Sequence, residues 1–314
     1  MMTSTLRHAL VTGGAGFIGS HLVRELLARG RAVSVLDDLS VGPRRNVPSA
    51  VRFIEGDVRD ADAVDEALQG VDCVFHNAAI VSVRASVEDF SRDADVNLMG
   101  TLNLLERMGR ARVRKAVLAS SMAVYADRAE PLPLPESHPT VPLSPYGIAK
   151  LAAERYWMLL CPHFGIEGTV LRYFNTYGPG QTLTPYVGVI TIFINRLLAG
   201  QPPVVFGDGE QRRDFVHVDD VVAANLLTVE GDAASRILNV GTGRATSVNE
   251  IACELTALLA PDLKPIHEAA QPGEVRNAVA DISAIREALG FEPRRPRLEL
   301  AEVIRYWRDA REAS

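Results

Sequence analysis

The chain has 314 residues, a formal net charge of −6 at pH 7 and three cysteines. This acidic balance disfavours general binding to nucleic acid or to anionic membranes, and no apolar run reaches the ~18 residues of a membrane span. The cysteines are too few and too widely spaced for a disulfide framework or a zinc site, so we expect neither. The first residues lead into a strand without a signal peptide, which predicts a cytoplasmic protein.

A glycine-rich loop follows the first predicted strand, which covers residues 8–12. Gly13 allows a tight turn, Gly16 lets a pyrophosphate approach the backbone, and Gly19 lets the following helix pack closely on the strand. The N-terminus of that helix would then face the anion. The order of strand, glycine loop and helix therefore predicts a dinucleotide-binding site.

A second predicted strand, residues 32–36, ends in Asp37 and Asp38. This position, about twenty residues after the glycines, is where an acidic side chain binds a ribose 2′-hydroxyl and repels a 2′-phosphate. The two aspartates therefore favour NAD over NADP as the cofactor.

Apolar runs and helical stretches alternate through the following part of the chain. The apolar runs, each ending in small or polar residues, are 51–55, 72–76, 116–119 and 168–172. The helical stretches between them include 60–69, 91–109 and 147–161. This alternation predicts right-handed βαβ units and an α/β fold with a doubly wound parallel sheet. Ligands bind beyond the carboxyl ends of such strands, where we expect Ser120, Ser121, Tyr146, Lys150 and Asn175 to converge.

Tyr146 and Lys150 are four residues apart in a predicted helix, so their side chains project from one face. Pro145 suits the first turn of this helix, and Ser144 can cap it. Tyrosine, with a normal pKa of ~10, is a poor base at neutral pH, but a nearby ammonium favours the phenolate. The spacing thus indicates a phenolate base, although the same pattern also arises by chance as a solvated tyrosine beside a lysine.

Ordered motifs along the whole chain resemble those of the extended short-chain dehydrogenase/reductases, specifically the NAD-dependent nucleotide-sugar epimerases and dehydratases. The motifs of the cofactor domain lie at 12–19, 56–58, 76–79, 120–125, 146–150 and 171–175. The segments that resemble the family's nucleotide-binding part lie at 205–209, 213–220, 239–241 and 272–276. The implied division is a Rossmann domain of residues 1–175, with a returning segment at about 217–245, and a smaller substrate lobe formed by 176–216 and 246–314.

The resemblance implies NAD as the cofactor. Asp37 would bind the adenosine ribose, Asp57 and Val58 would lie along the adenine, and Lys150 would hold the nicotinamide ribose. The full set of residues expected to contact the cofactor is Gly13, Gly16, Phe17, Ile18, Gly19, Asp37, Asp38, Asp57, Val58, Asn77, Ala78, Ala79, Asn97, Tyr146, Lys150 and Tyr173.

The resemblance also implies three catalytic residues acting on a nucleotide sugar. Tyr146 would remove the proton of the C4 hydroxyl, and Lys150 would lower the pKa of this tyrosine. Ser121, four residues before Tyr125, would hydrogen-bond the C4 oxygen.

The substrate-binding residues implied by the resemblance are Ser121, Met122, Tyr146, Asn175, Val189, Phe206, Arg213, Gln271 and Glu274. Asn175 would contact the diphosphate and Phe206 would pack on the nucleotide base. Arg213 would neutralise a phosphate, because the arginine fork matches phosphate oxygens. Gln271 departs from the arginine that the family commonly has at this position, and Arg276 is the candidate to replace it.

The expected reaction is C4 epimerisation of a UDP-hexose through a 4-keto intermediate. Family dehydratases need a second acid and base after the serine strand, and related decarboxylases have a glutamate there, whereas this chain has Met122 and Ala123. Ala278, at the position of a size gate near C2, would admit an N-acetyl group. We expect UDP-glucose or UDP-galactose first, then UDP-N-acetylhexosamine and UDP-glucuronate. The alternatives are a dehydratase or reductase of the same family and a non-catalytic NAD-binding regulator.

Family members commonly pair through two helices, which implies a homodimer. The apolar residues that are candidates for this face are Leu102, Leu104, Leu105, Met108, Leu151 and Trp157. The alternative is that these residues form part of the intramolecular core.

Overall fold

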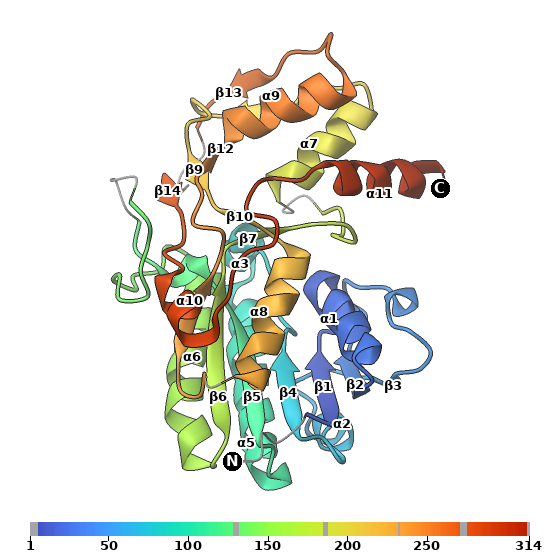
Figure 1. Ribbon diagram of the computed structural model, residues 1–314, viewed down its shortest axis with the longest axis vertical. Helices are drawn as coiled ribbons and strands as arrows, with labels where there is room; N and C mark the ends of the chain where they lie inside the picture. Colours follow the sequence, from blue (N-terminus) through green and yellow to red (C-terminus); the bar gives the residue numbers. More distant parts are fainter. Residues whose placement is uncertain (1–5, 128–131, 185–187, 232, 271–274, 313–314) are drawn as a thin grey trace.

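A seven-stranded parallel sheet lies at the centre of the computed structural model, which describes residues 6–127, 132–184, 188–231, 233–270 and 275–312 (Figure 1). The strands follow the order β11-β6-β5-β4-β1-β2-β3 across the sheet. Their bounds are β1 His8–Thr12, β2 Ala32–Asp37, β3 Arg52–Glu55, β4 Cys73–His76, β5 Lys115–Ser121, β6 Glu167–Tyr173 and β11 Ile237–Val240. The chain winds outward from β1 in both directions, which confirms the predicted doubly wound α/β fold.

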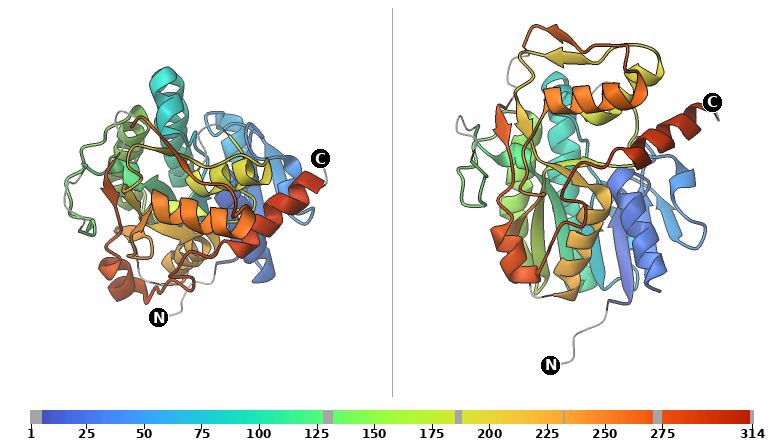
Figure 2. Two further views of the ribbon diagram at one scale, coloured as in Figure 1. Left: turned by 90° about the horizontal axis from the view of Figure 1, so that it is seen from above. Right: turned by 45° about the horizontal axis from the view of Figure 1, so that its top comes forward.

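Helices cover both faces of the sheet (Figures 1 and 2). Successive residues of a strand point to opposite faces, so Ala9 and Val11 pack in one layer and Leu10 in the other. The first layer contains α1 (Phe17–Ala28) and α8 (Val218–Glu230), and the second contains α2 (Ala61–Ala67), α5 (Gly100–Ala111) and α6 (Pro145–His163). No helix in the described ranges is both long and apolar enough to cross a membrane.

Helix α6 begins where the sequence predicts. The Ser144 hydroxyl accepts a hydrogen bond from the Gly147 N–H at 3.1 Å, and Pro145 occupies the first turn. Two short helices and a π-helical segment precede α5 in the chain and pack against α6. They are α3 (Val83–Glu88), α4 (Phe90–Ala94) and the π-helical segment Asp95–Met99, which continues into α5. The π-helical geometry within the predicted helix 91–109 is not foreseen by the sequence pattern.

A smaller lobe lies beyond the carboxyl ends of the central strands, at the top of Figure 1. Phe193, Leu255 and Trp307 belong to its separate core. The helices that enclose this core are α7 (Val189–Leu198), α9 (Val248–Leu259) and α11 (Ala301–Glu312). Short strands pair β7 (Asn175–Tyr177) with β10 (Phe215–His217), β8 (Val204–Phe206) with β13 (Ile266–Glu268), and β9 (Arg212–Arg213) with both β12 (Thr246–Ser247) and β14 (Asn277–Ala278).

The packing differs from the expected division of the chain in one segment. Helix α10 (Ser283–Leu289) falls within residues 246–314, which are expected in the smaller lobe. Ile285 and Phe291 are nevertheless buried in the core beside the central sheet. This segment therefore packs with the sheet layer rather than with the helices of the smaller lobe.

Most of the residues predicted to form a dimer face are intramolecular core. The four that are completely buried between the sheet and its helices are Leu104, Leu105, Met108 and Trp157. Leu102 and Leu151 are half-buried and pack against the two core layers. Helical periodicity identifies an apolar face correctly here, but the neighbour that covers it is the chain's own sheet.

Candidate active site

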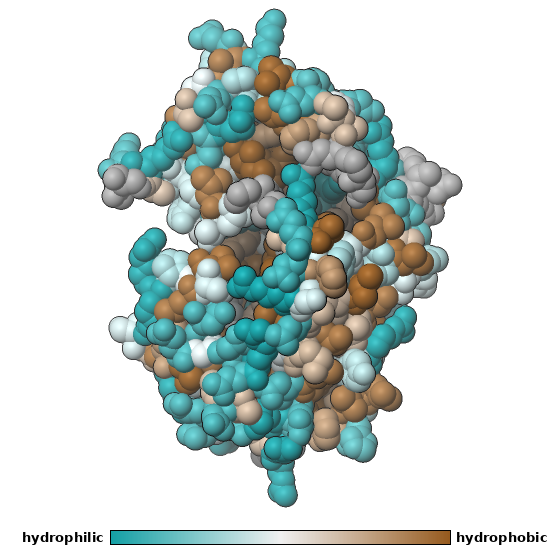
Figure 3. All heavy atoms as spheres, turned by 180° about the vertical axis from the view of Figure 1, so that it is seen from behind, coloured by the Kyte–Doolittle hydropathy of each residue, from teal (hydrophilic) through white to brown (hydrophobic). Residues whose placement is uncertain are grey.

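The predicted site residues gather at the carboxyl edge of the central sheet, because parallel strands all end on the same side. Asp37 is the last residue of β2, Ser121 is the last of β5 and Tyr173 is the last of β6. Helix α6 begins at this edge, which places Tyr146 and Lys150 in its first turns. The space-filling view shows the molecular surface hollowed between the sheet domain and the smaller lobe (Figure 3).

The glycine loop after β1 leaves no room for side chains. Gly13 has a φ of 68°, and a Cβ on it would lie 2.7 Å from the backbone nitrogen of Ala78. A Cβ on Gly19 would lie 2.1 Å from the carbonyl oxygen of Gly13. In the described residues no side chain caps the N-terminus of α1, so its first N–H groups are available to an anion. The glycines are therefore required by the close packing of the loop on the backbone after β4 and on the start of α1.

Asp37 is tied to this loop by its carboxylate. One oxygen accepts a hydrogen bond from the Ala15 N–H at 2.8 Å, and the other accepts from the Leu39 N–H at 2.9 Å. Burial raises the pKa of Asp37, and the two N–H groups oppose the rise. Asp38 is instead engaged with Ser40, whose hydroxyl donates to it at 2.6 Å. Asp37 is thus the aspartate that lies against the glycine loop.

Several other residues predicted to contact the cofactor also lie at this edge of the sheet. They are Phe17 and Ile18 in the first turn of α1, Val58 after β3, and Asn77, Ala78 and Ala79 after β4. The Asn77 Oδ1 atom is buried and has no hydrogen-bond partner among the described residues. Such an orphaned acceptor beside the glycine loop fits a site that holds a polar ligand. Together with the glycine geometry, it fits the residues to NAD.

Three predicted cofactor residues already have strong protein partners. Asp57 forms an ion pair with Arg59 at 2.6 Å, which lowers the pKa of the aspartate. The Tyr173 hydroxyl hydrogen-bonds Asn225 of α8 at 3.0 Å. Asn97 binds the backbone of the loop after β4, as described below. Their contacts with a cofactor stay predictions.

Tyr146 and Lys150 are both buried, with relative exposures of 6% and 4%. The lysine nitrogen lies 5.9 Å from the centroid of the tyrosine ring and donates a hydrogen bond to the Ala119 carbonyl at 3.1 Å. The Tyr146 N–H donates to the Ser86 hydroxyl at 3.2 Å. The predicted common face is confirmed, and the alternative of a solvated tyrosine does not apply to this pair.

The protein alone does not lower the pKa of Tyr146, contrary to the expected effect of Lys150. Burial raises the pKa of Tyr146 to about 12, the adjacent Ser121 hydroxyl opposes this rise, and Asp93 adds to it. Burial also lowers the pKa of Lys150 to about 8, against the charges of Asp93 and Glu154. The low-dielectric site disfavours both charged forms, and the tyrosine is neutral in the unliganded chain.

The predicted substrate residues lie on elements from both lobes. Met122 follows Ser121, and its sulfur lies 4.0 Å from the amide nitrogen of Asn175 in β7. Three further predicted substrate residues are half-buried. Val189 is the first residue of α7, Phe206 is the last of β8 and Arg213 is the last of β9. Arg213 donates to the carbonyl of Arg212 at 3.0 Å. These residues stand on the lobe that faces the carboxyl edge of the sheet.

Two predicted substrate residues, Gln271 and Glu274, lie outside the described residues. Arg276, the candidate to replace the arginine missing at position 271, forms a two-bond ion pair with Asp208 at 2.7 and 2.9 Å. This ion pair lies at the surface, because both side chains are about half exposed. Arg276 would have to leave Asp208 before it could contact a phosphate.

Buried polar residues that the sequence did not predict as site residues also lie around Tyr146 and Lys150. Asp93 is hydrogen-bonded to the predicted cofactor residue Asn97 at 2.9 Å, and Glu154 forms a buried ion pair with Arg172. Their signal is spacing, since Asp93 precedes Asn97 by four residues and Glu154 follows Lys150 by four. Burial is what distinguishes them from an ordinary polar face, and a single sequence does not show burial.

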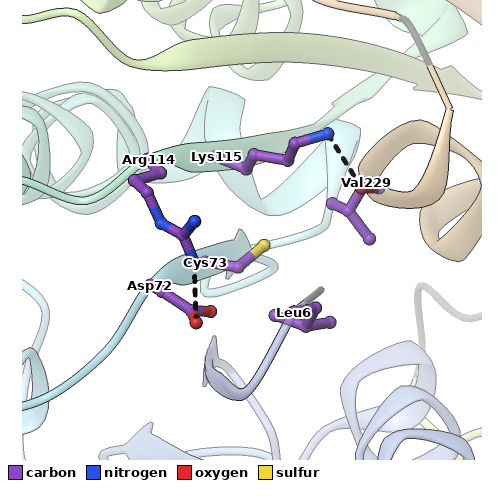
Figure 4. A pocket seen from close by; sticks show the side chains of 6 residues that line it. All are labelled: Leu6, Asp72, Cys73, Arg114, Lys115 and Val229. Carbon is purple, nitrogen blue, oxygen red and sulfur yellow. Dashed lines mark hydrogen bonds and ion pairs between the residues drawn. The ribbon is translucent and has the colours of Figure 1, made fainter. Parts of the chain in front are cut away.

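A small pocket of about 10 Å³ lies at the opposite end of the sheet (Figure 4). Cys73 and Lys115 in its lining are the first residues of β4 and β5, whereas Ser121 ends β5. Arg114 pairs with Asp72 at 3.0 Å, and Lys115 donates to the Val229 carbonyl at 2.9 Å. This pocket is therefore separate from the candidate active site.

The chain is similar in sequence and fold to known proteins. The family model described as the NAD dependent epimerase/dehydratase family matches residues 9–241. The chain is 38% identical to UDP-glucose 4-epimerase of Mycolicibacterium smegmatis over 308 residues, which cover 96% of this chain and 98% of that protein. The structure of UDP-glucose 4-epimerase from Thermotoga maritima with UDP-glucose matches with a TM-score of 0.91 and 39% identity, covering 96% of this chain and 99% of that chain. UDP-N-acetylglucosamine 4-epimerase from Methanobrevibacter ruminantium, in complex with UDP-N-acetylmuramic acid, matches with a TM-score of 0.92 and 33% identity, covering 98% and 99%.

Proposed function

Because the chain belongs to the NAD dependent epimerase/dehydratase family, we propose that it is an enzyme that interconverts the C4 epimers of a UDP-hexose. The observation that carries this proposal is the buried pair Tyr146 and Lys150 beside Ser121, with Met122 and Ala123 in the adjoining positions. A non-catalytic NAD-binding regulator would not need these three polar residues together. The named activity of the bacterial relatives supports the same reaction.

The glycine loop, Asp37 and the buried Asn77 acceptor would hold NAD at the carboxyl edge of the sheet. Bound NAD supplies a hydride acceptor for C4 and afterwards a hydride donor. The loop glycines allow the pyrophosphate to reach the N-terminus of α1, and Asp37 would take the ribose hydroxyls. Lys150 would contribute its ammonium beside the nicotinamide ribose.

Tyr146 would take the proton from the C4 hydroxyl while Ser121 holds the same oxygen by a hydrogen bond. A 4-keto sugar results, and its rotation presents the other face of C4 for reduction. As C4 takes the hydride back on this other face, Tyr146 would return the proton to the same C4 oxygen. Epimerisation therefore needs a tightly held nucleotide and a loosely held hexose, which suits Phe206 and Arg213 as nucleotide contacts on the smaller lobe.

Met122 and Ala123 favour epimerisation over the other reactions of the family. Elimination of water would need a further acid and base near C5 and C6, and neither a thioether nor a methyl group transfers a proton. The described neighbour of Met122 on β7 is Asn175, an amide that does not titrate. A dehydratase or a reductase is the second candidate, since the family name covers both epimerases and dehydratases.

UDP-glucose and UDP-galactose are the substrates we propose first. Ala278, in β14 beside Arg212 and Arg213 of β9, has almost no exposed surface and a small side chain. A small residue near C2 would also accept an N-acetyl group, as the name of the UDP-N-acetylglucosamine 4-epimerase from Methanobrevibacter ruminantium suggests. UDP-N-acetylhexosamine and UDP-glucuronate follow in that order.

Incubation of the purified protein with a panel of UDP-hexoses, without added reductant, tests this proposal. The panel contains UDP-glucose, UDP-galactose, UDP-N-acetylglucosamine and UDP-glucuronate, and proton NMR follows the configuration at C4. We expect an interconverting pair of epimers, reached from either side, with no net consumption of cofactor. Formation of only a dehydrated or decarboxylated sugar would rule out the epimerase assignment.

We further propose that two copies of the chain pair through the outer face of α6. Ile148, Tyr156 and Leu159 are exposed on this helix, and their spacing puts them on one stripe. Leu159→Glu should convert a dimer into a monomer in sedimentation analysis, because it places a charge in the stripe. Leu258→Glu on α9 is the matched control and should leave the mass unchanged. A monomeric parent protein, or a dimer that survives Leu159→Glu, would contradict this surface.

A further inference from the structure

Asp93 is a buried carboxylate with one oxygen that has no partner. Its relative exposure is 1%, and its Oδ1 atom accepts a hydrogen bond from the Asn97 amide at 2.9 Å. The Oδ2 atom is buried and has no hydrogen-bond partner among the described residues. Burying a carboxylate oxygen in this way is costly, so the position calls for a functional explanation.

The surrounding elements hold this carboxylate against α6. Asp93 lies in the last turn of α4, and the π-helical segment that follows carries Asn97. Asn97 accepts from the Ile80 N–H at 2.9 Å and donates to the Ile80 carbonyl at 3.0 Å, which anchors the segment to the loop after β4. Both α4 and the π-helical segment pack on α6. Single π-helical turns often occur at functional sites.

Glu154 is the other carboxylate close to Lys150, and its charge is already matched. Arg172 donates to both of its oxygens at 2.9 and 2.7 Å, and the Ser120 hydroxyl donates at 2.5 Å. Asp93 forms no ion pair with an arginine in the described part of the chain. Of the two carboxylates, Asp93 is therefore the one without an arginine partner among the described residues.

We propose that Asp93 is a positioning residue for the catalytic pair, whose buried carboxylate keeps the Lys150 side chain charged. This role deepens the proposed epimerase function and rests on it. A buried ammonium tends to lose its proton, and a fixed carboxylate counteracts that tendency. Asn97 would fix the direction of the carboxylate, because the Asn97 side-chain amide hydrogen-bonds both Asp93 and the backbone of Ile80.

The electrostatics of the site agree with this arrangement. Burial lowers the pKa of Lys150 to about 8. The carboxylates of Asp93 and Glu154 oppose this change, and Asp93 has the larger effect. The effect is reciprocal, since Lys150 opposes the rise that burial causes in the pKa of Asp93. The other titratable groups facing the pair are Tyr146 and Glu154 on α6 and His76 on β4, whose pKa burial lowers to about 3. His76 is therefore neutral, and Asp93 is the carboxylate that opposes the effect of burial on Lys150 most.

Removal of the Asp93 charge should lower the pKa of Lys150, so that the ammonium is lost at a lower pH. The same removal also eases ionisation of Tyr146, whose pKa the Asp93 charge helps to raise, so the titration of Lys150 itself is the decisive measurement. Asp93→Asn tests the charge, because an asparagine keeps the volume and can still accept from Asn97.

Lysine NMR on the NAD-loaded protein measures the effect without relying on any sugar substrate. The chain has three lysines, Lys115, Lys150 and Lys264, so protein labelled with ¹³C at lysine Cε gives a simple spectrum. Lys150→Arg assigns the signal. We expect Asp93→Asn to lower the pKa of Lys150 by about one unit, as the loss of a nearby buried counter-ion does.

Two further variants separate charge from packing. Asp95→Asn, two residues away and exposed in an ion pair with Arg59, is the matched control and should leave the titration of Lys150 unchanged. Asp93→Glu keeps the charge and should hold the pKa of Lys150 close to the parent value even if stability falls. The proposal is overturned if Asp93→Asn titrates like the parent, or if Asp93→Glu lowers the pKa as much as Asp93→Asn. Because the titration needs no turnover, failure of the sugar panel and failure of this proposal give different results.

Discussion

Tyr146→Phe is expected to reduce epimerase turnover by at least about 10²-fold, the range typical for loss of a general base. The substitution removes one hydroxyl from a buried ring and leaves its packing in place. Ser121 would still hold the C4 oxygen, but no group in its place would accept the proton. We expect the variant to keep its bound NAD, because the glycine loop and Asp37 do not depend on the phenol. Turnover of the preferred UDP-hexose and the NAD content of the purified protein are the two measurements.

Tyr306→Phe is the matched control for this variant. It removes the same atom from a partly exposed tyrosine on α11 and should leave turnover unchanged. If Tyr146→Phe kept turnover within about threefold of the parent, Tyr146 would lose its role as the base. A variant without NAD would show instead that the tyrosine also holds the cofactor.

The pH dependence of the parent should reflect both members of the pair. Burial raises the pKa of Tyr146 to about 12 and lowers that of Lys150 to about 8 in the unliganded chain. Turnover that needs the phenolate and the ammonium together should rise with pH until Lys150 begins to lose its proton. It should then level off, because each further gain in phenolate is offset by a loss of ammonium. Because the two groups interact, the limbs report the pair rather than either residue alone.

The glycine loop and the start of α6 could be predicted from the sequence because their signals are local. Gly13 and Gly19 are required by contacts with their own neighbours in the fold, and Ser144 caps the helix that follows it. Parallel strands then bring Asp37 and Ser121 to one edge, whatever the lengths of the connections. Local chemistry and sheet topology together were enough for the fold class.

The remaining features depend on burial and on contacts between distant segments. Leu104 and Trp157 show a helical apolar period, but the period does not tell whether the sheet or a second copy covers them. The spacing of Tyr146 and Lys150 predicts their common face, yet the unliganded site raises rather than lowers the pKa of the tyrosine, because desolvation dominates. The sequence pattern does not single out Asp93, because only the packing shows that its Oδ2 atom is buried without a hydrogen-bond partner among the described residues.

Arg172→Met is expected to destabilise the folded protein by about 3–5 kcal/mol, the cost of leaving a buried charge without its partner. Arg172 and Glu154 are almost completely buried and share two hydrogen bonds at 2.9 and 2.7 Å. Arg172 also stacks on Tyr125, with 4.7 Å between the guanidinium carbon and the ring centroid. The pair links β6 to α6 one turn after Lys150. Denaturant unfolding of the variant and the parent measures the loss.

The double variant Arg172→Met, Glu154→Gln distinguishes an uncompensated charge from lost packing. Glutamine can still bond with Ser120, and no charge remains, so we expect most of the lost stability to return. Arg110→Met breaks the exposed pair with Glu106 on α5 and should cost at most about 0.5 kcal/mol. If the double variant were as unstable as Arg172→Met alone, the arginine would act through its contacts with Tyr125 and the backbone, and charge compensation would not be its role. A full recovery would show that the fold tolerates a neutral pair at this position.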